Sequence, residues 1–220
     1  TTLYFEAQQE DDFRQRGFSK DGKHQQPQIM LGLLVNAAGE PLSYELFEGS
    51  AFEGHTLLPV IEAFKEKFRL PKIIIVADAG MLSEKNLQAI CEKEYEFIVG
   101  ARIKNESKIR KEEILSFRLK NKESRMIVKE DGQKLIVSYS SKRAQNDAFN
   151  RERGLRKLEK ALQSGKLTKQ HINNRGYNKY LKLDGQIKIS LDYDKFKEDK
   201  KWDGLKGYLT NTQLSKEEVI

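Results

Sequence analysis

The sequence predicts an α/β fold in which a mixed β-sheet is flanked by helices. Residues 1–47 contain three stretches of strand-like composition separated by turn residues. Residues 57–68 and 83–93 carry apolar side chains at helical spacing. Between these two helical segments, residues 73–77 are five consecutive apolar residues, four of them β-branched. Such a run predicts a strand that is buried on both faces.

The first three strands are predicted at residues 1–7, 28–36 and 41–47. The first of them is rich in threonine and aromatic residues, and no turn or cap precedes it. A polar loop that contains glycine follows over residues 8–26. Residues 37–40 are expected to turn the second strand back into the third, which makes this pair a hairpin.

Helices then link strands that run parallel. Thr56 is the expected N-cap of the helix before the 73–77 run, and Ser83 is the expected N-cap of the helix after it. Residues 96–100 form the next predicted strand. Three antiparallel strands followed by helix-linked parallel strands is the order of an RNase H-like fold. In that fold the first and fourth strands place carboxylates side by side.

Asp78 directly follows the apolar run and precedes a small residue and a glycine. In an α/β sheet the carboxyl ends of the strands border the functional crevice, so Asp78 stands where a catalytic acid is expected. An aspartate in this position also commonly caps a turn or the following helix. The position alone therefore leaves both interpretations of Asp78 open.

The rest of the chain is predicted from the same kinds of pattern. Asp131-Gly132 and Asp184-Gly185 are expected hairpin turns, and Ser215 is the expected cap of a last helix. Gly165 is expected to end a long helix. The predicted elements are a helix at 103–119, a hairpin at 125–139, a helix at 141–164, a hairpin at 173–192, a charged link at 195–201 and a strand at 202–212.

Charge is distributed unevenly along the chain. There are 40 Lys and Arg residues against 33 Asp and Glu residues, which gives a net charge of +7. Residues 1–100 hold 10 basic and 16 acidic residues, whereas residues 101–201 hold 28 basic and 14 acidic residues. A segregated basic segment favours an anionic partner, and nucleic acid is the first candidate.

The helix predicted at 141–164 carries much of this basic charge. Its apolar stripe of Leu155, Leu158 and Leu162 is narrow, and cations cover much of the remaining surface. Such a surface can follow phosphates with salt-dependent affinity, or it can be a solvated face without a partner. The candidate DNA-binding residues, two of them in the loop near the start of the chain, are Arg16, Lys20, Lys142, Arg143, Arg151, Arg153, Arg156 and Lys157.

Several other classes of protein do not fit the sequence. The single cysteine, Cys91, cannot form an internal disulfide, which favours a reducing cytoplasmic setting. The three histidines lack the spacing of zinc ligands. No apolar run approaches the length of a membrane span, and no leader pattern stands at the start. We therefore expect a soluble cytoplasmic protein, or a piece of one.

Five blocks of sequence follow one another along the chain: Thr1–Glu6, Arg16–Gly22, Gly39–Leu42, Val76–Met81 and Asp203–Thr212. Together they resemble the conserved blocks of bacterial insertion-sequence transposases of the DDE class, which cut and paste DNA. The resemblance spans nearly the whole chain in the expected order. It implies an RNase H-like core at 1–103 and 202–220, interrupted by a basic insertion subdomain at 104–201. Ser50 departs from the family pattern, which often has asparagine after this glycine.

The resemblance implies roles for individual residues. Asp78 matches the middle acid of the family's Asp-Asp-Glu triad, a catalytic and metal-binding residue. In the family the first aspartate lies just before the threonine pair at the start, and the glutamate lies further along the helix after the last strand. Neither of these two acids is expected within residues 1–220, and both ends of the chain are expected to lie inside elements. Glu217 and Glu218 come too early in that helix and are interpreted as favourable charges in its first turn.

The implied chemistry requires more than one carboxylate. Strand cleavage and joining are in-line phosphoryl displacements, in which two Mg²⁺ or Mn²⁺ ions about 3.5–4 Å apart activate the attacking group and stabilise the leaving oxygen. Mg²⁺ is held by one or two carboxylates and completes its shell with water and phosphate. Because Asp78 alone cannot hold two ions, we expect the 220-residue chain to be inactive and the full-length protein to be a transposase.

Two other functions remain open at this point. An RNase H-like nuclease or resolvase would share the fold, the metals and Asp78, but it would not need the basic insertion. A non-enzymatic DNA-binding module would bind DNA with steep salt dependence and no sequence preference. For a transposase, the expected partners are transposon-end and target DNA and a second copy of the protein, as a homodimer in the synaptic complex.

Overall fold

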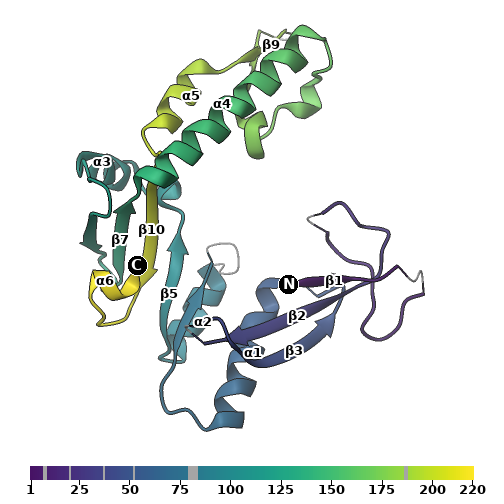
Figure 1. Cartoon of the computed structure of the whole chain (residues 1–220), viewed down its shortest axis with the longest axis vertical. Helices are drawn as coiled ribbons and strands as arrows, with labels where there is room; N and C mark the ends of the chain where they lie inside the picture. The colour runs from purple at the N-terminus through teal and green to yellow at the C-terminus, as the bar shows by residue number, and fades with distance from the viewer. Residues whose placement is uncertain (7–8, 20, 37, 52, 79–83, 186–187) are drawn as a thin grey trace. The chain divides into compact units, whose positions relative to one another are not determined.

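The computed structural model describes residues 1–220 except 7–8, 20, 37, 52, 79–83 and 186–187, and describes only the backbone of residues 53–56 (Figure 1). The described chain divides into two compact units. The first unit comprises residues 1–99 and 210–213, and the second comprises residues 100–209 and 214–220. The chain therefore returns to the first unit for four residues near its end.

The secondary structure confirms a mixed α/β composition. The strands are β1 (Thr2–Tyr4), β2 (Gln28–Val35), β3 (Pro41–Glu48), β4 (Ile74–Ala77), β5 (Glu96–Ala101), β6 (Ser124–Val128), β7 (Lys134–Tyr139), β8 (Leu181–Asp184), β9 (Lys188–Leu191) and β10 (Leu205–Thr210). The α-helices are α1 (Glu53–Phe68), α2 (Glu84–Glu92), α3 (Lys108–Ser116), α4 (Ser141–Gln163), α5 (Tyr193–Lys200) and α6 (Lys216–Val219). Three 3₁₀ turns are η1 (Ile103–Asn105), η2 (Lys169–His171) and η3 (Gly176–Tyr180).

The described strands form three sheets. One is the antiparallel sheet β1-β2-β3, another has the order β4-β5-β10-β7-β6, and the third is the pair β8-β9. The five-stranded sheet is mixed, because β4 and β5 pair in parallel whereas β6 and β7 pair antiparallel. A mixed sheet flanked by helices confirms the predicted fold class and is compatible with an RNase H-like fold.

The first unit opens with the predicted hairpin. Thr2 of β1 lies opposite Met30 of β2, and Met30 lies opposite Phe47 of β3. Helix α1 packs against β2 and β3. A Cβ added to Gly32 would lie 3.0 Å from Cγ2 of Val60, so a glycine in the middle of β2 allows α1 to approach the sheet closely.

One predicted helix cap in the first unit is wrong. Helix α1 begins at Glu53, so Thr56 lies inside the helix and is not its N-cap. The sequence predicted a later start because glycine usually interrupts a helix. Gly54, however, falls in the first turn, where backbone N–H groups lack helical partners in any case. The other predicted cap, Ser83, lies outside the described residues.

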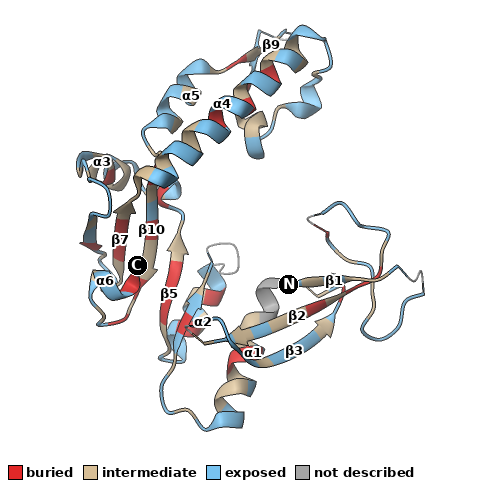
Figure 2. Cartoon of the chain, in the orientation of Figure 1, coloured by how far each residue is buried: buried red, intermediate tan, exposed pale blue. Residues whose placement is uncertain are grey.

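Strand β4 is not buried on both faces. Ile75 is only 6% exposed, but Ile74 is 40% and Val76 is 74% exposed. The neighbouring strand β5, by contrast, contains a run of buried residues, coloured red in Figure 2. Strand β4 stands at the end of its sheet order and pairs with β5. Within the residues that the structure describes, β1 pairs with β2 and no pairing of β1 with β4 is present. The apolar run therefore forms an edge strand, which periodicity alone does not distinguish from a central one.

The second unit contains the predicted hairpin around Asp131-Gly132. Strands β6 and β7 pair with Ile127 opposite Leu135, and Gly132 has φ +79° in the turn between them. The helix expected at 103–119 is divided into η1 and α3, because Ser107 has extended backbone angles and its side chain caps α3. The core of this region consists of Ile103, Ile114, Ile127, Leu135 and Val137.

Helix α4 confirms the long basic helix. Ser140 caps its start, and Gly165, with φ +65°, follows its end. The apolar stripe packs into a cluster with the β8-β9 hairpin (Figure 1). The hairpin expected at 173–192 is confirmed only over 181–191, because residues 176–180 form η3. The charged link expected at 195–201 is wrong: residues 193–200 form α5, whose N-cap Asp192 accepts a hydrogen bond from the backbone N–H of Lys195 at 3.0 Å.

The segment Thr210-Asn211-Thr212 attaches to the backbone of β5 in the first unit. The Asn211 side chain accepts a hydrogen bond from the N–H of Phe97 at 2.8 Å and donates one to the carbonyl oxygen of Tyr95 at 3.0 Å. The Thr210 hydroxyl donates to the carbonyl oxygen of Phe97 at 2.6 Å. One amide side chain thus continues the hydrogen-bonding pattern of a strand beyond the end of β10.

We predict that Asn211→Ala lowers the free energy of unfolding by roughly 2–3 kcal/mol, because a backbone N–H and a carbonyl oxygen of β5 both lose their partner. Urea unfolding at pH 7 measures this loss. Asn211→Asp keeps the acceptor and removes the donor, so it should be destabilised as well. Asn146→Ala, at an exposed position of α4, is the matched control. A loss in Asn211→Ala no larger than in this control would contradict the assignment.

Candidate functional site

Asp78 is an exposed residue that directly follows β4. The parallel pairing of Ala77 with Val99 places it at the carboxyl end of the β4-β5 pair, the edge at which the sequence predicted a catalytic acid. The residues after Ala79 that would complete the predicted turn, and Ala79 itself, lie outside the described residues. The structure therefore places Asp78 at a strand end, within the first unit.

The described residues do not by themselves form a metal site. No group of three or more His, Cys, Asp or Glu side chains in the described part of the chain is arranged to hold a metal ion. A pair of divalent ions needs several oxygen ligands, and Asp78 is one carboxylate. The residues present therefore do not fit a two-metal centre without further acids.

Glu217 and Glu218 serve the start of α6, as the sequence predicted. Glu218 accepts a hydrogen bond from the backbone N–H of Ser215 at 2.9 Å, and the Ser215 hydroxyl accepts one from the N–H of Glu218 at 3.3 Å. This capping box lowers the pKa of Glu218, first through the backbone hydrogen bond. Glu217 lies in the same first turn, where a negative charge is favourable.

The glycine-bearing loop before β2 is held by structural contacts. Gln28 is 1% exposed, and its side-chain amide donates to the carbonyl oxygen of Gly49 at 2.7 Å. A Cβ on Gly17 would lie 2.2 Å from that same oxygen, so only glycine fits there. Arg16 is exposed and pairs with Glu10 at 3.4 Å, and Lys20 lies outside the described residues. The Arg16–Glu10 pair thus stabilises the loop in which the sequence predicted two DNA-binding cations, Arg16 and Lys20.

The six α4 cations that the sequence predicted as DNA contacts fall into three groups. Lys142, Arg153, Arg156 and Lys157 are exposed. Arg143 is half exposed, and its Nε lies 3.7 Å from Oδ2 of Asp147, one turn further along α4. These five positions agree with a surface open to solvent. The sixth, Arg151, differs from all of them.

Arg151 is a buried structural cation. It is 7% exposed, pairs with Asp203, and its guanidinium lies 5.3 Å from the ring centroid of Phe196. A buried ion is costly unless it is paired, and Asp203 supplies the opposite charge. The DNA contact predicted for Arg151 does not fit this burial, because the side chain points to the same side of α4 as the apolar stripe. Its spacing of four and seven residues from Leu155 and Leu158 is the signal in the sequence for this placement.

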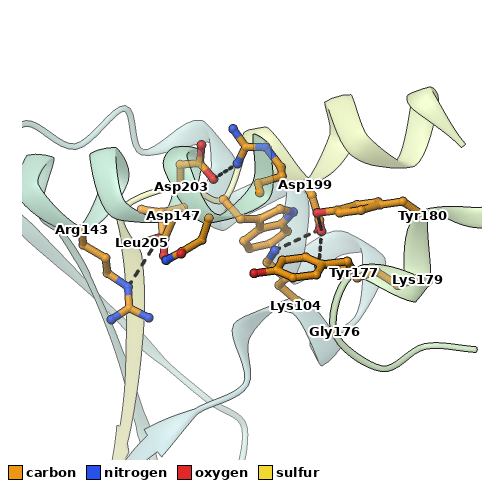
Figure 3. A pocket seen from close by; sticks show the side chains of 13 residues that line it. Lys104, Arg143, Asp147, Gly176, Tyr177, Lys179, Tyr180, Asp199, Asp203 and Leu205 are labelled. Carbon is orange, nitrogen blue, oxygen red and sulfur yellow. Dashed lines mark hydrogen bonds and ion pairs between the residues drawn. The ribbon is translucent and has the colours of Figure 1, made fainter. Parts of the chain in front are cut away.

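Asp199 collects hydrogen bonds beside the Arg151 pair, at a cavity of about 330 Å³ (Figure 3). The amine of Lys104 donates to Oδ1 of Asp199 at 2.9 Å, the hydroxyl of Tyr180 donates to Oδ2 at 2.7 Å, and Lys179 pairs with the same carboxylate. Burial by itself raises the pKa of Asp199, but these three donors outweigh it and lower the pKa to about 2. Burial, and then the hydrogen bond to Asp199, raises the pKa of Tyr180.

This network is sufficient to explain the polar cavity as a structural feature. Its carboxylate joins η1, η3 and α5, three elements that the sequence presents as separate polar stretches. Sequence reasoning missed Asp199 because it treated residues 195–201 as a charged link. The signal available was the N-cap at Asp192, which predicts a helix and hence a fixed position for Asp199.

Comparison with known proteins identifies one family. The model of the family described as "Transposase DDE domain" matches residues 1–218. No curated protein and no solved structure matches the chain. The match runs through both units and includes Asp78 and α4. No helix in the described part of the chain is long and apolar enough to cross a membrane.

We predict that Asp199 makes the stability of the second unit depend on pH in acid. Its pKa is about 2 in the folded chain against an ordinary value of 3.8. A lowered pKa means that the stabilisation is fully present above about pH 4 and is lost as the pH falls towards 2. Asp199→Asn should therefore lower the free energy of unfolding at pH 7 by roughly 2 kcal/mol.

Urea unfolding of the two proteins between pH 7 and pH 2 measures this effect. The difference between wild type and Asp199→Asn should shrink as Asp199 takes up a proton. Glu130→Gln, at an exposed position of the β6-β7 turn, controls for the loss of one carboxylate. A difference that stays constant down to pH 2 would show that the charge of Asp199 does not stabilise the fold.

Proposed function

Because the chain belongs to the transposase DDE-domain family, we propose that it supplies Asp78 and a DNA-binding helix to metal-dependent cleavage and strand transfer of DNA. Members of this family are DNA transposases of the kind found in insertion sequences, and they use divalent metal ions. The observation that carries the proposal is the match over residues 1–218, within which Asp78 follows β4 directly. The roles of individual residues are the part we propose.

Asp78 is proposed as one metal-binding acid of the complete site. Its support is its place at the carboxyl end of the β4-β5 pair and its exposure to solvent. Mg²⁺ or Mn²⁺, as two ions in the complete site, would polarise the phosphate and lower the pKa of an attacking water. The family's first aspartate and its glutamate are expected outside residues 1–220. We therefore propose that this chain by itself does not cleave DNA.

The outer face of α4 is proposed as the surface that contacts the DNA backbone. We define this outer face as the side opposite the apolar stripe, at 3.6 residues per turn. The residues of the helix on that face are exposed, and the exposed Glu152 stands at its edge, four residues before Arg156. The five cations on it are Lys142, Arg153, Arg156, Lys157 and Lys160.

In this cationic stripe, four of the five cations are grouped at residues 153–160, and Lys142 lies on the same side of α4 eleven residues before Arg153. From residue 142 to residue 160 an α-helix rises by about 27 Å, so the stripe is long enough to meet several successive phosphates of one strand. Arg143 lies at the flank beside Asp147, and Arg151 lies on the buried side. This partition favours Lys160 over Arg151 in the set of DNA contacts, while Arg16 and Lys20 stay predictions of the sequence alone.

Two alternative functions predict different uses of Asp78 and of the α4 surface. An RNase H-like nuclease or resolvase would also use Asp78 but would not need the α4 surface. A non-enzymatic DNA-binding module would need the α4 surface and not Asp78. The family match favours the transposase over both. A homodimer in the synaptic complex, holding transposon ends and target, follows from the family resemblance and stays a prediction.

We predict that the 220-residue chain leaves supercoiled plasmid intact in the presence of Mg²⁺ or Mn²⁺, because one carboxylate cannot hold the ion pair that the reaction needs. Agarose-gel separation of supercoiled and nicked forms measures this. Metal-dependent nicking that Asp78→Ala abolishes would overturn the inactivity of the chain. Nicking that Asp78→Ala leaves unchanged would instead show a contaminating nuclease.

We predict that reversing three cations of the outer face, Arg153→Glu, Arg156→Glu and Lys157→Glu, weakens duplex DNA binding by at least about tenfold at low salt. Each lost phosphate contact should also make the slope of log K against log salt about 0.9 shallower. Fluorescence anisotropy with a labelled duplex over a salt series measures both quantities.

The matched control reverses the same number of exposed lysines away from α4, at Lys120, Lys169 and Lys182. It changes the net charge equally but spares the outer face, so its affinity should fall much less. Equal losses in the two triple variants would mean that only total charge matters. In that case the α4 stripe would have no special role.

A further inference from the structure

Phe149 is an apolar side chain on the charged face of α4. It is 57% exposed, whereas the leucines of the same helix pack against the β8-β9 hairpin. It lies seven residues after Lys142 and four before Arg153, so it falls on the outer face in the interval between Lys142 and the cations at 153–160. An aromatic ring in this position makes few contacts with apolar side chains of the protein. It is instead available to contact a ligand that binds along the stripe.

The ring is held next to a cation. The Cζ atom of Arg153 lies 5.7 Å from the centroid of the Phe149 ring, within the range of a cation–π interaction. Arg156 and Lys160 continue the same row, seven and eleven residues beyond Phe149. The outer face therefore offers two kinds of contact at once: cations for phosphates, and one ring flanked by a guanidinium plane.

We propose that Phe149 stacks on a base of unpaired DNA while the cations of the outer face hold that strand's phosphates. This inference rests on the proposed function for the identity of the partner as DNA, and it adds that the partner strand is unpaired at α4. Grooves that combine cations with exposed aromatic rings are typical of proteins that bind single strands without reading sequence, because every base has a face on which a ring can stack.

The ring favours an unpaired strand over intact duplex. In a duplex the faces of the bases are covered by their neighbours, and a protein ring reaches them only by unstacking a base step. In an unpaired strand the base faces are open. Phosphate contacts alone would need only the five cations, so they do not account for an exposed phenyl ring among them. The positive charge of the stripe favours an anionic partner surface.

The test compares Phe149→Leu, which keeps an apolar side chain but loses the aromatic face, with the unchanged chain. Binding is measured by fluorescence anisotropy with a labelled oligothymidine and with a duplex of the same length. Phe149→Leu should lower affinity for the single strand by about 5- to 100-fold, the range expected for loss of one stacked base. Its affinity for duplex should not change, and its salt slope on the single strand should stay the same, because no phosphate contact is lost.

Two matched controls separate stacking from other effects. Phe149→Trp keeps an aromatic face and should retain the single-strand affinity. A strand of the same length built from abasic sites keeps the phosphates but offers no base, so the unchanged chain and Phe149→Leu should bind it equally. Because the ring is exposed, thermal unfolding of both variants should match that of the unchanged chain.

Each outcome has one meaning. Unchanged single-strand affinity of Phe149→Leu overturns the inference, and so does an equal loss on single strand, duplex and abasic strand. If the triple reversal at Arg153, Arg156 and Lys157 weakens binding while Phe149→Leu does not, the α4 surface stands and only the stacking role fails. If neither variant weakens binding to either DNA, the proposed DNA-binding role of α4 fails together with the stacking role.

Discussion

The second unit depends on two partly buried carboxylates: Asp203, which neutralises Arg151 on the inner side of α4, and Asp199, which neutralises lysines of η1 and η3. Asp203 pairs with Arg151, and Asp199 takes two lysines and a tyrosine hydroxyl. Removing one partner of a buried ion pair typically costs about 3–5 kcal/mol, because the other charge stays buried without compensation. The Arg151–Asp203 pair therefore favours the rotation of α4 in which Arg151 faces the rest of the unit. With the helix held in this rotation, Asp203 lies on its inner side and Asp147 lies on its flank. The outer face therefore keeps its positive charge.

The same rotation serves both packing and charge. Gly154 lies one turn before Leu158 on α4. A Cβ added to Gly154 would lie 2.0 Å from the Tyr177 ring. Glycine there lets η3 and its tyrosine approach α4, and the approach brings Tyr180 to Asp199. The hydrophobic cluster and the ion pairs are thus parts of one contact. Rotating α4 to bury its outer cations would break both.

Much of this organisation follows from local patterns in the sequence, and the rest requires tertiary contacts. The hairpin at Asp131-Gly132 and the long helix could be predicted because each is encoded by its own residues: a turn glycine in one case, and a cap, a stripe and a terminal glycine in the other. The burial of Arg151 could be predicted from its helical spacing relative to Leu155 and Leu158. The prediction missed it because the charges were considered in chain order and not by their position around the helix. The exposure of Val76 could not be predicted, since an apolar run looks the same in an edge strand and in a central one.

The sequence blocks that resemble the family differ in what their side chains contact. Thr210-Asn211-Thr212 belongs to a block that resembles the family, yet its described side chains bind the backbone of β5. Asp78 belongs to another such block, and it is exposed at a strand end. The first block therefore holds one part of the chain to another, whereas the second presents a carboxylate to which we assign metal binding only as a proposal.

The placement of Asp78 and α4 in different compact units separates two properties that a transposase must combine. The unit with Asp78 draws on the acidic first hundred residues, and the unit with α4 draws on the basic segment. Substitutions on the outer face of α4 change no residue of β4, and Asp78 variants change no cation of α4. Under the roles that we propose, DNA binding and metal-dependent chemistry are therefore assigned to residues of different units. A protein in which both were built from one cluster of side chains would not allow this, because cations placed close enough to share the cluster would compete with the metal ions for its carboxylates.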